Sequence, residues 1–184
     1  MASSKSSPTV LGTGNIRKLL LEYSGPAIAA MMASALYNVI DRIFIGQGVS
    51  ALAISGLAIT MPVMNLSAAF GAMIGAGGAT LTSIKMGQQD YKSTEKVLGN
   101  VVLLNVVLGV IFMVLGLTFI DQILFFFGAS SETIPYARDF MQVILLGNVI
   151  THLYLGLNNV MRASGNPRKA MYVTIMTVII NLTL

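Results

Sequence analysis

Four long runs without a charged residue constrain this chain more than any other feature. They cover residues 23–40, 43–84, 97–120 and 140–161. A helix that crosses the hydrocarbon core of a bilayer needs about 20 apolar residues, and each run is close to that length or longer. Only 10% of the residues are charged, whereas a soluble domain carries about 25%. The sequence therefore predicts an all-α integral membrane protein, folded as a polytopic helix bundle.

The expected spans are about five in number. Four are predicted to cross fully, at residues 24–45, 56–84, 97–120 and 140–161, and the fifth covers 170–184. This last span is incomplete, because roughly 20 residues are needed to cross. We therefore expect the gene to continue past Leu184. Residues 1–14 are small and polar and predict a disordered tail, while 15–23 have helical spacing that suits the membrane surface.

The basic residues are unevenly distributed between the two sides of this bundle. If the spans alternate, nine of the eleven lysines and arginines lie on one side, before the first span and in the loops at 85–96 and 162–169. Loops rich in lysine and arginine stay in the cytoplasm, which predicts a cytoplasmic N-terminus. This asymmetry explains the net charge of +4 without a nucleic-acid partner. The chain has no cysteine, so neither a disulfide nor a thiolate metal site can form.

Asp41 stands out because it interrupts the apolar sequence in the outer half of the first span. Insertion scales assign about +2.5 to +3.5 kcal/mol to a central aspartate, more than one or two apolar neighbours offset. One interpretation places Asp41 and Arg42 at the outer interface, with their charges in water. The other shelters Asp41 within the protein, since Tyr37 and Asn38 lie four and three positions earlier on the same helix face. The sequence leaves both interpretations open.

Other polar and small residues favour structural roles. Gly71 and Gly75 are four positions apart and predict close approach of another helix. His152, the only histidine, is predicted to be a hydrogen-bonded interior residue. An intramembrane aspartyl protease needs two embedded acids, and the HExxH pattern of zinc proteases is absent. The sequence therefore argues against an enzyme.

Three stretches together resemble one family. These are "YNVIDRIFIG", "MPVMNLSAAFGAMIGAGGATLTSIKMGQQDYKSTEKVLGN" and "LGLNNVMRASGNPRKAMYV". In this order they resemble the multidrug and toxic compound extrusion (MATE) transporters. The resemblance implies twelve helices in two lobes and identifies residues 15–184 as part of the amino-terminal lobe. The rest of the chain would supply the second lobe, and an Asp or Glu is expected at position 185.

The resemblance also implies a function. MATE transporters are secondary antiporters that export drugs and organic cations in exchange for H⁺ or Na⁺, without a cofactor. The bacterial pattern matches Asp41 as the cation-coupling carboxylate and Asn181 as its partner, with Asn158 as a further member and Tyr37 and Asn38 in support. If the ion is Na⁺, Asp41 and Asn181 would bind it. The implied location is the bacterial inner membrane. A related flippase for lipid-linked oligosaccharides, or a non-transporting membrane subunit, remain alternatives.

Overall fold

The computed structural model describes residues 15–48 and 50–183, apart from the side chains at positions 18, 41, 45, 51 and 181–183. Within these ranges the chain is helical and contains no β-strand. The helices are α2 (Ile16–Gly48), α3 (Ala51–Gly87), α4 (Tyr91–Thr118), α5 (Ile120–Phe126), α6 (Ile134–Leu146), α7 (Asn148–Ala163) and α8 (Pro167–Thr183). The all-α prediction is therefore confirmed.

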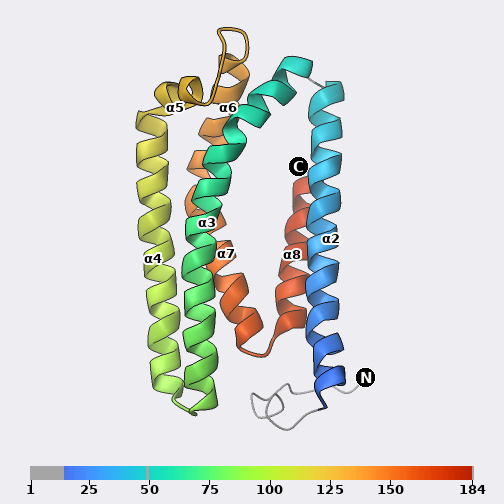
Figure 1. Ribbon diagram of the computed structural model, residues 1–184, viewed down its shortest axis with the longest axis vertical. Helices are drawn as coiled ribbons and strands as arrows, with labels where there is room; N and C mark the ends of the chain where they lie inside the picture. The colour runs from blue at the N-terminus through green and yellow to red at the C-terminus, as the bar shows by residue number, and fades with distance from the viewer. Residues whose placement is uncertain (1–14, 49, 184) are drawn as a thin grey trace.

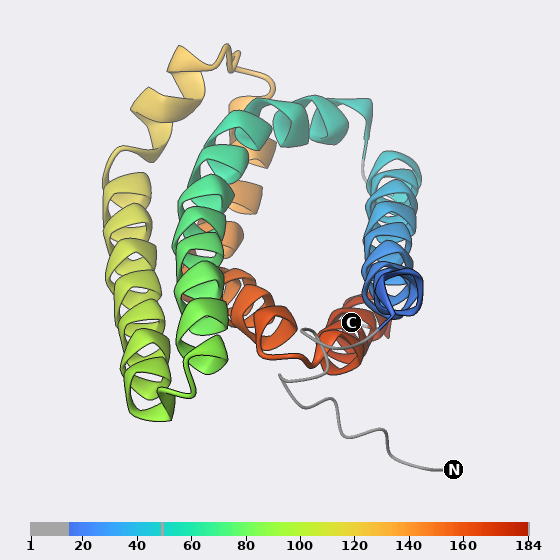
Figure 2. The ribbon, with the colours of Figure 1, turned by 60° about the horizontal axis from the view of Figure 1, so that its bottom comes forward.

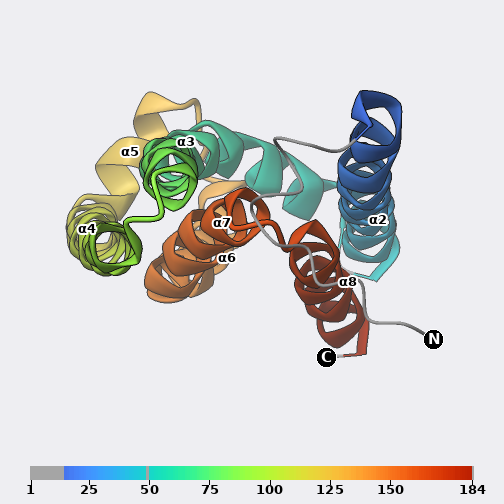
Figure 3. The same cartoon turned by 90° about the horizontal axis from the view of Figure 1, so that it is seen from below.

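The helices form two groups that meet along α7 and α8. One group contains α3, α4, α6 and α7, with α7 packed against both α3 and α4. In the other group, α2 packs against α8, so the first and last described helices are neighbours (Figure 1). Seen along the helix axes, α8 lies between α7 and α2 (Figure 3). One side of α7 therefore packs against α3 and α4, and another side packs against α8.

The three predicted basic segments lie at one end of the molecule. The beginning of α2, the turn between α3 and α4, and the turn between α7 and α8 are all at the bottom of Figure 1. Helix α5 and the connection from α2 to α3 lie at the other end. Alternation of the helices thus brings the basic segments to one end, as the sequence predicts.

Three helices are long and apolar enough to cross a membrane, at Leu19–Gly48, Leu52–Gly87 and Tyr91–Thr118. The predicted single helix at 140–161 is wrong. It is broken at Gly147 into α6 and α7, which meet at a bend of 54° and together make a fourth candidate span. Apolar composition alone does not reveal such a break, because both halves remain hydrophobic.

Helix α2 begins earlier than predicted. Residues 16–23 continue directly into the first span and do not form a separate segment at the membrane surface. Helix α3 begins at Ala51, whereas the second span was predicted to begin at residue 56. Ser50 caps this helix, and its hydroxyl accepts a hydrogen bond from the backbone N–H of Ala53 at 3.2 Å. Serine favours the N-cap position, which explains why the helix begins immediately after it.

Glycines allow α3 and α7 to approach closely, as the sequence predicts. A Cβ atom added to Gly75 would lie 3.0 Å from the Cα of Gly156 and 3.1 Å from the carbonyl oxygen of Leu155. At Gly71, the added atom would lie 3.3 Å from the ring of His152. Ordinary carbon contacts are about 3.5–4.0 Å, so no side chain fits at Gly75 without moving α7. The amino-terminal part of α3, a helix that contains Pro62, bends away from its remainder (Figure 2).

Candidate functional site

A polar cavity among the described residues lies where the two helix groups meet. It has a volume of about 470 Å³ and opens between α2, α7 and α8. Its polar lining comes from all three helices: Ser34, Asn38, Tyr154, Asn158, Asn159, Arg162 and Thr174. Polar residues gathered inside a membrane bundle are characteristic of substrate or ion pathways, and we therefore take this cavity as the candidate site.

Thr174 joins α7 to α8 within this cavity. Its hydroxyl accepts a hydrogen bond from the Tyr154 hydroxyl at 2.8 Å and one from the Asn158 amide at 3.4 Å. It donates its own proton to the carbonyl oxygen of Ala170 at 3.1 Å. Thr174 is almost completely buried, so these bonds replace the water that its hydroxyl would otherwise need.

Asn158 is the centre of a second set of contacts. Its amide also donates to the carbonyl oxygen of Ala170, at 3.2 Å. Its side-chain oxygen accepts from Nε of Arg162 at 3.0 Å. The guanidinium of Arg162 therefore supplies a positive charge to the cavity, and Asn158 helps to hold it there. A fixed cation at this position favours a negatively charged neighbour.

The remaining predicted site residues are only partly described. Asn38 is exposed on the cavity side of α2, where its amide donates to the carbonyl oxygen of Ser34 at 2.9 Å. Tyr37 is half-buried. Asp41 lies in α2 and Asn181 in α8, but their side chains are outside the described part of the chain. Arg42 is exposed and contacts the sulfur of Met61 at 3.7 Å.

A second polar cluster lies on the opposite side of α7, buried against α3 and α4. The Ser67 hydroxyl donates to the side-chain oxygen of Asn148 at 2.8 Å and lies 2.9 Å from Nε2 of His152. The Asn148 amide in turn donates to the carbonyl oxygen of Gly109 at 3.2 Å. The cluster thus ties three helices together, and the interior role predicted for His152 is confirmed.

This geometry assigns the tautomer of His152. Because the single hydroxyl proton of Ser67 goes to Asn148, the hydrogen bond between Ser67 and His152 needs the proton on Nε2 of the ring. Nδ1 is then an acceptor, and it has no hydrogen-bond partner among the described residues. The neutral ring therefore leaves one acceptor unpaired. Protonating Nδ1 would cost more free energy, because it would leave an unpaired donor on a charged ring at the same buried position.

The sequence predicted Asn158 in the site but missed Tyr154, Arg162 and Thr174. A signal for the first two was present, because Tyr154, Asn158 and Arg162 are spaced four residues apart and so share a face of α7. Thr174 carried no such signal. Its role depends on the packing of α8 against α7, which spacing within one helix does not report.

Comparison with known proteins places this arrangement in a family. The MatE family model matches residues 26–184. The multidrug export protein MepA of Staphylococcus haemolyticus is 31% identical over 170 residues, which are 92% of this chain and 38% of that protein. MepA of Staphylococcus aureus strain MRSA252 is 28% identical over 167 residues, 91% of this chain and 37% of that protein. The chain therefore spans about two fifths of the length of these curated relatives.

Solved structures support the same assignment. The structure of the MATE multidrug transporter DinF-BH, solved in complex with a ligand, matches 98% of this chain and 40% of its own, with a TM-score of 0.90 and 34% identity. The family model covers most of the sequence, and the fold of the chain matches that of a solved family member over nearly its whole length. The chain belongs to the MatE family, the multidrug and toxic compound extrusion (MATE) transporters.

Proposed function

We propose that this chain is part of a secondary antiporter that exports organic cations or drugs in exchange for H⁺ or Na⁺. The observation that carries the proposal is the polar cavity between α2, α7 and α8, found in a member of a multidrug transporter family. In this proposal the protein is not an enzyme and needs no cofactor, because the coupling ion is itself transported. The chain lies in the bacterial inner membrane with its N-terminus in the cytoplasm.

Asp41 is the proposed coupling carboxylate, assisted by Asn181 and Asn158. Support comes from the position of Asp41 in α2, three residues after Asn38, which lines the cavity. Further support comes from the pairing of α2 with α8, the helices that carry Asp41 and Asn181. A carboxylate that binds either the ion or the exported cation would couple the two fluxes, as antiport requires.

The full cycle is proposed to need a second lobe of the same gene product. Alternating access proceeds by rocking one half of a transporter against the other. Curated relatives of this chain are more than twice the length that it matches, which leaves room for such a lobe. We expect residues 1–184 by themselves to transport nothing.

The test compares Asp41→Asn with the unmodified gene product in inverted membrane vesicles. Drug accumulation driven by a proton gradient, a sodium gradient or neither gradient is measured for each protein. We expect Asp41→Asn to reach the membrane in normal amounts and to lose gradient-driven transport. Asp139→Asn is the matched control, since Asp139 is an exposed residue of α6 that does not line the cavity.

Three outcomes would contradict the proposal in different ways. Transport retained by Asp41→Asn would place this residue at the membrane interface with a structural role. Movement of a lipid-linked oligosaccharide without drug export would favour the flippase. No transport by the unmodified gene product under any gradient would favour a non-transporting subunit.

A further inference from the structure

An apolar groove runs between α3 and α4, whereas the candidate site lies between α2, α7 and α8. It has a volume of about 310 Å³ and is lined almost entirely by apolar residues and glycine, among them Gly77, Leu81, Val97 and Leu104. Both helices are candidate membrane spans, so the groove lies at the depth of lipid chains. Leu81 and Leu104 are each 50% exposed, and the groove is therefore an open surface feature within the described residues.

Two adjacent glycines give the groove its shape. At Gly78 an added Cβ would collide with the side chain of Val101, so α3 and α4 pack closely at Gly78. At Gly77 an added Cβ would meet nothing within 4 Å, although Gly77 also lines the groove. The space above Gly77 is thus unfilled by the described side chains and is suited to a narrow apolar group.

Lysines lie at the end of the groove nearest the turn between α3 and α4. Lys85 is one helical turn beyond Leu81 in α3, and Lys96 is one turn before Asn100 in α4. Leu81 and Asn100 both line the groove. Because residues four apart share a helix face, Lys85 and Lys96 continue the two walls of the groove toward the membrane surface.

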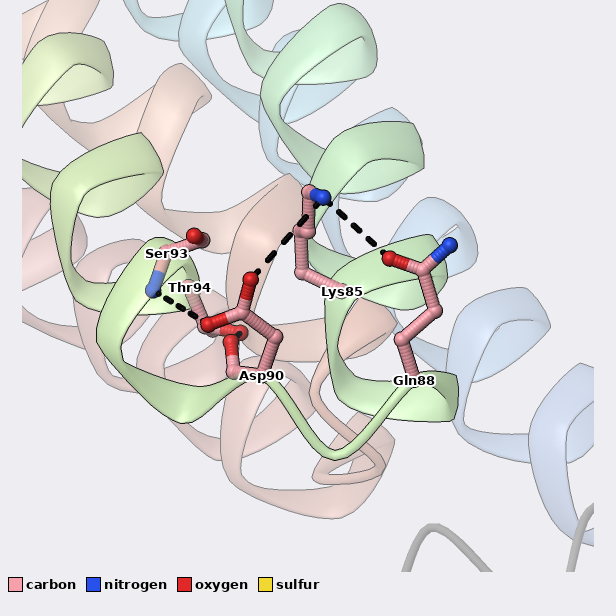
Figure 4. A network of polar contacts seen from close by, with 5 residues as sticks. All are labelled: Lys85, Gln88, Asp90, Ser93 and Thr94. Carbon is pink, nitrogen blue, oxygen red and sulfur yellow. Dashed lines mark hydrogen bonds and ion pairs between the residues drawn. The ribbon is translucent and has the colours of Figure 1, made fainter.

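The turn itself holds these charges together. The Asp90 carboxylate caps α4 by accepting from the backbone N–H of Ser93 at 3.1 Å, and Nζ of Lys85 lies 3.9 Å from its other oxygen and 3.2 Å from the Gln88 side chain (Figure 4). The hydrogen bonds from Ser93, together with Lys85 and Lys96, hold the pKa of Asp90 below its usual value. Both lysines are therefore close enough to Asp90 to interact electrostatically with its carboxylate.

The ion pair between Lys85 and Asp90 leaves a net positive charge in the segment 85–96. A pair 3.9 Å apart between partly exposed side chains is weak, so Lys85 can turn toward a stronger anion. Lys92, Lys96 and Lys85 outnumber Asp90 and Glu95 in the segment 85–96. An apolar groove that ends at excess lysines matches the two parts of one kind of molecule, an acyl chain and a negative headgroup.

We propose that the groove between α3 and α4 binds one anionic phospholipid, with an acyl chain over Gly77 and the headgroup phosphate at Lys85 and Lys96. Basic pockets between membrane helices recognise anionic headgroups in this way. The site is separate from the cavity between α2, α7 and α8, and it does not depend on the coupling ion or on the exported substrate.

The test measures lipid retained by the complete gene product in native mass spectrometry. The protein is purified in mixed micelles that contain equal amounts of phosphatidylglycerol and phosphatidylcholine. We expect one phosphatidylglycerol to be retained in preference to phosphatidylcholine. Lys85→Gln and Lys96→Gln should each weaken this preference about fivefold, and together about 25-fold, since each lysine near an anionic lipid contributes about the same favourable amount. Lys169→Gln, which removes a lysine at the same end of the molecule but on α8, should leave it unchanged.

A second pair of variants tests the acyl-chain part of the groove. Gly77→Leu places a side chain in the open space and should abolish retention of the lipid. Gly99→Leu is its matched control, because an added Cβ at Gly99 also meets nothing within 4 Å but Gly99 does not line the groove. Equal retention of the two lipids by the unmodified protein would overturn the proposal. So would unchanged retention in Gly77→Leu, the result expected if another segment of the gene product covers the groove.

Discussion

Ser67→Ala tests whether the buried cluster between α3 and α7 stabilises the fold. The substitution removes one hydroxyl and with it two hydrogen bonds, of 2.8 Å to Asn148 and 2.9 Å to His152. Both partners are almost completely buried, so neither gains water in exchange. In soluble proteins a buried polar group left unpaired costs about 1–3 kcal/mol. Interhelical hydrogen bonds measured within a membrane protein average only about 0.6 kcal/mol and reach about 1.7.

The membrane values should apply here, because the unfolded chain also finds partners in the bilayer. For two bonds we therefore expect Ser67→Ala to lower the free energy of unfolding by about 1–3 kcal/mol. The assay is reversible unfolding in mixed micelles, followed by circular dichroism. Ser83→Ala is the control, since Ser83 lies in the same helix with an exposed side chain. A loss no greater for Ser67→Ala than for Ser83→Ala would refute the reasoning.

A double-mutant cycle then isolates one bond of the cluster. His152→Phe keeps a ring beside Gly71 but removes Nε2, the atom that contacts Ser67. Because the hydrogen bond couples the two residues, the effects of Ser67→Ala and His152→Phe should not add, and we expect a coupling energy of about 0.5–1.5 kcal/mol. Additive effects would mean that the two residues contribute independently.

Two further predictions follow from other parts of the structure. Gly75→Ala forces a methyl group to within 3.0 Å of the backbone of Gly156. We expect it to destabilise the protein by about 1–3 kcal/mol in the same unfolding assay. Gly77→Ala, where an added Cβ meets nothing within 4 Å, should not destabilise the protein. Asp90 has a lowered pKa in the folded protein, so its contribution to stability is present above about pH 4 and is lost as the pH falls through the folded value. The stability difference between the unmodified protein and Asp90→Asn, which can still cap α4, should accordingly shrink toward pH 3 in an unfolding series, and a constant difference would contradict this.

The sequence predicted the helical class and most of the spans because a membrane-spanning helix needs about 20 apolar residues, and runs of that length are visible in the sequence. It also predicted the close approach at Gly75, since only a small residue permits such a contact. The break at Gly147 was missed because the sequence around it does not differ from that of an unbroken membrane helix. Glycine and polar residues occur in many unbroken membrane helices, and the bend is stabilised by contacts with other helices, such as that of Asn148 with Gly109.

The candidate site shows the same limit. Asn158 could be predicted from its resemblance to a family pattern, and its neighbours on α7 could have been found by their spacing of four. Thr174 could not, because its importance arises only when α8 packs against α7 and brings its hydroxyl to Tyr154. Long-range pairing of helices is information that no local pattern carries. The roles of Asp41, Asn158 and Asn181 in ion coupling, and the supporting roles of Tyr37 and Asn38, stay predictions.

The pairing of α2 with α8 has a consequence for synthesis of the protein. About 120 residues separate the end of α2 at Gly48 from the beginning of α8 at Pro167. At about 5–20 residues per second, the ribosome needs roughly 6–24 s to produce that length. During this interval α2 is already made while α8, the helix it packs against most extensively, is not, so the cavity that Asn38 lines has not yet formed. Until α8 is synthesised, α2 therefore lacks its contacts with α8. During that time the first span must be stabilised by lipid, by the insertion machinery or by α3 alone.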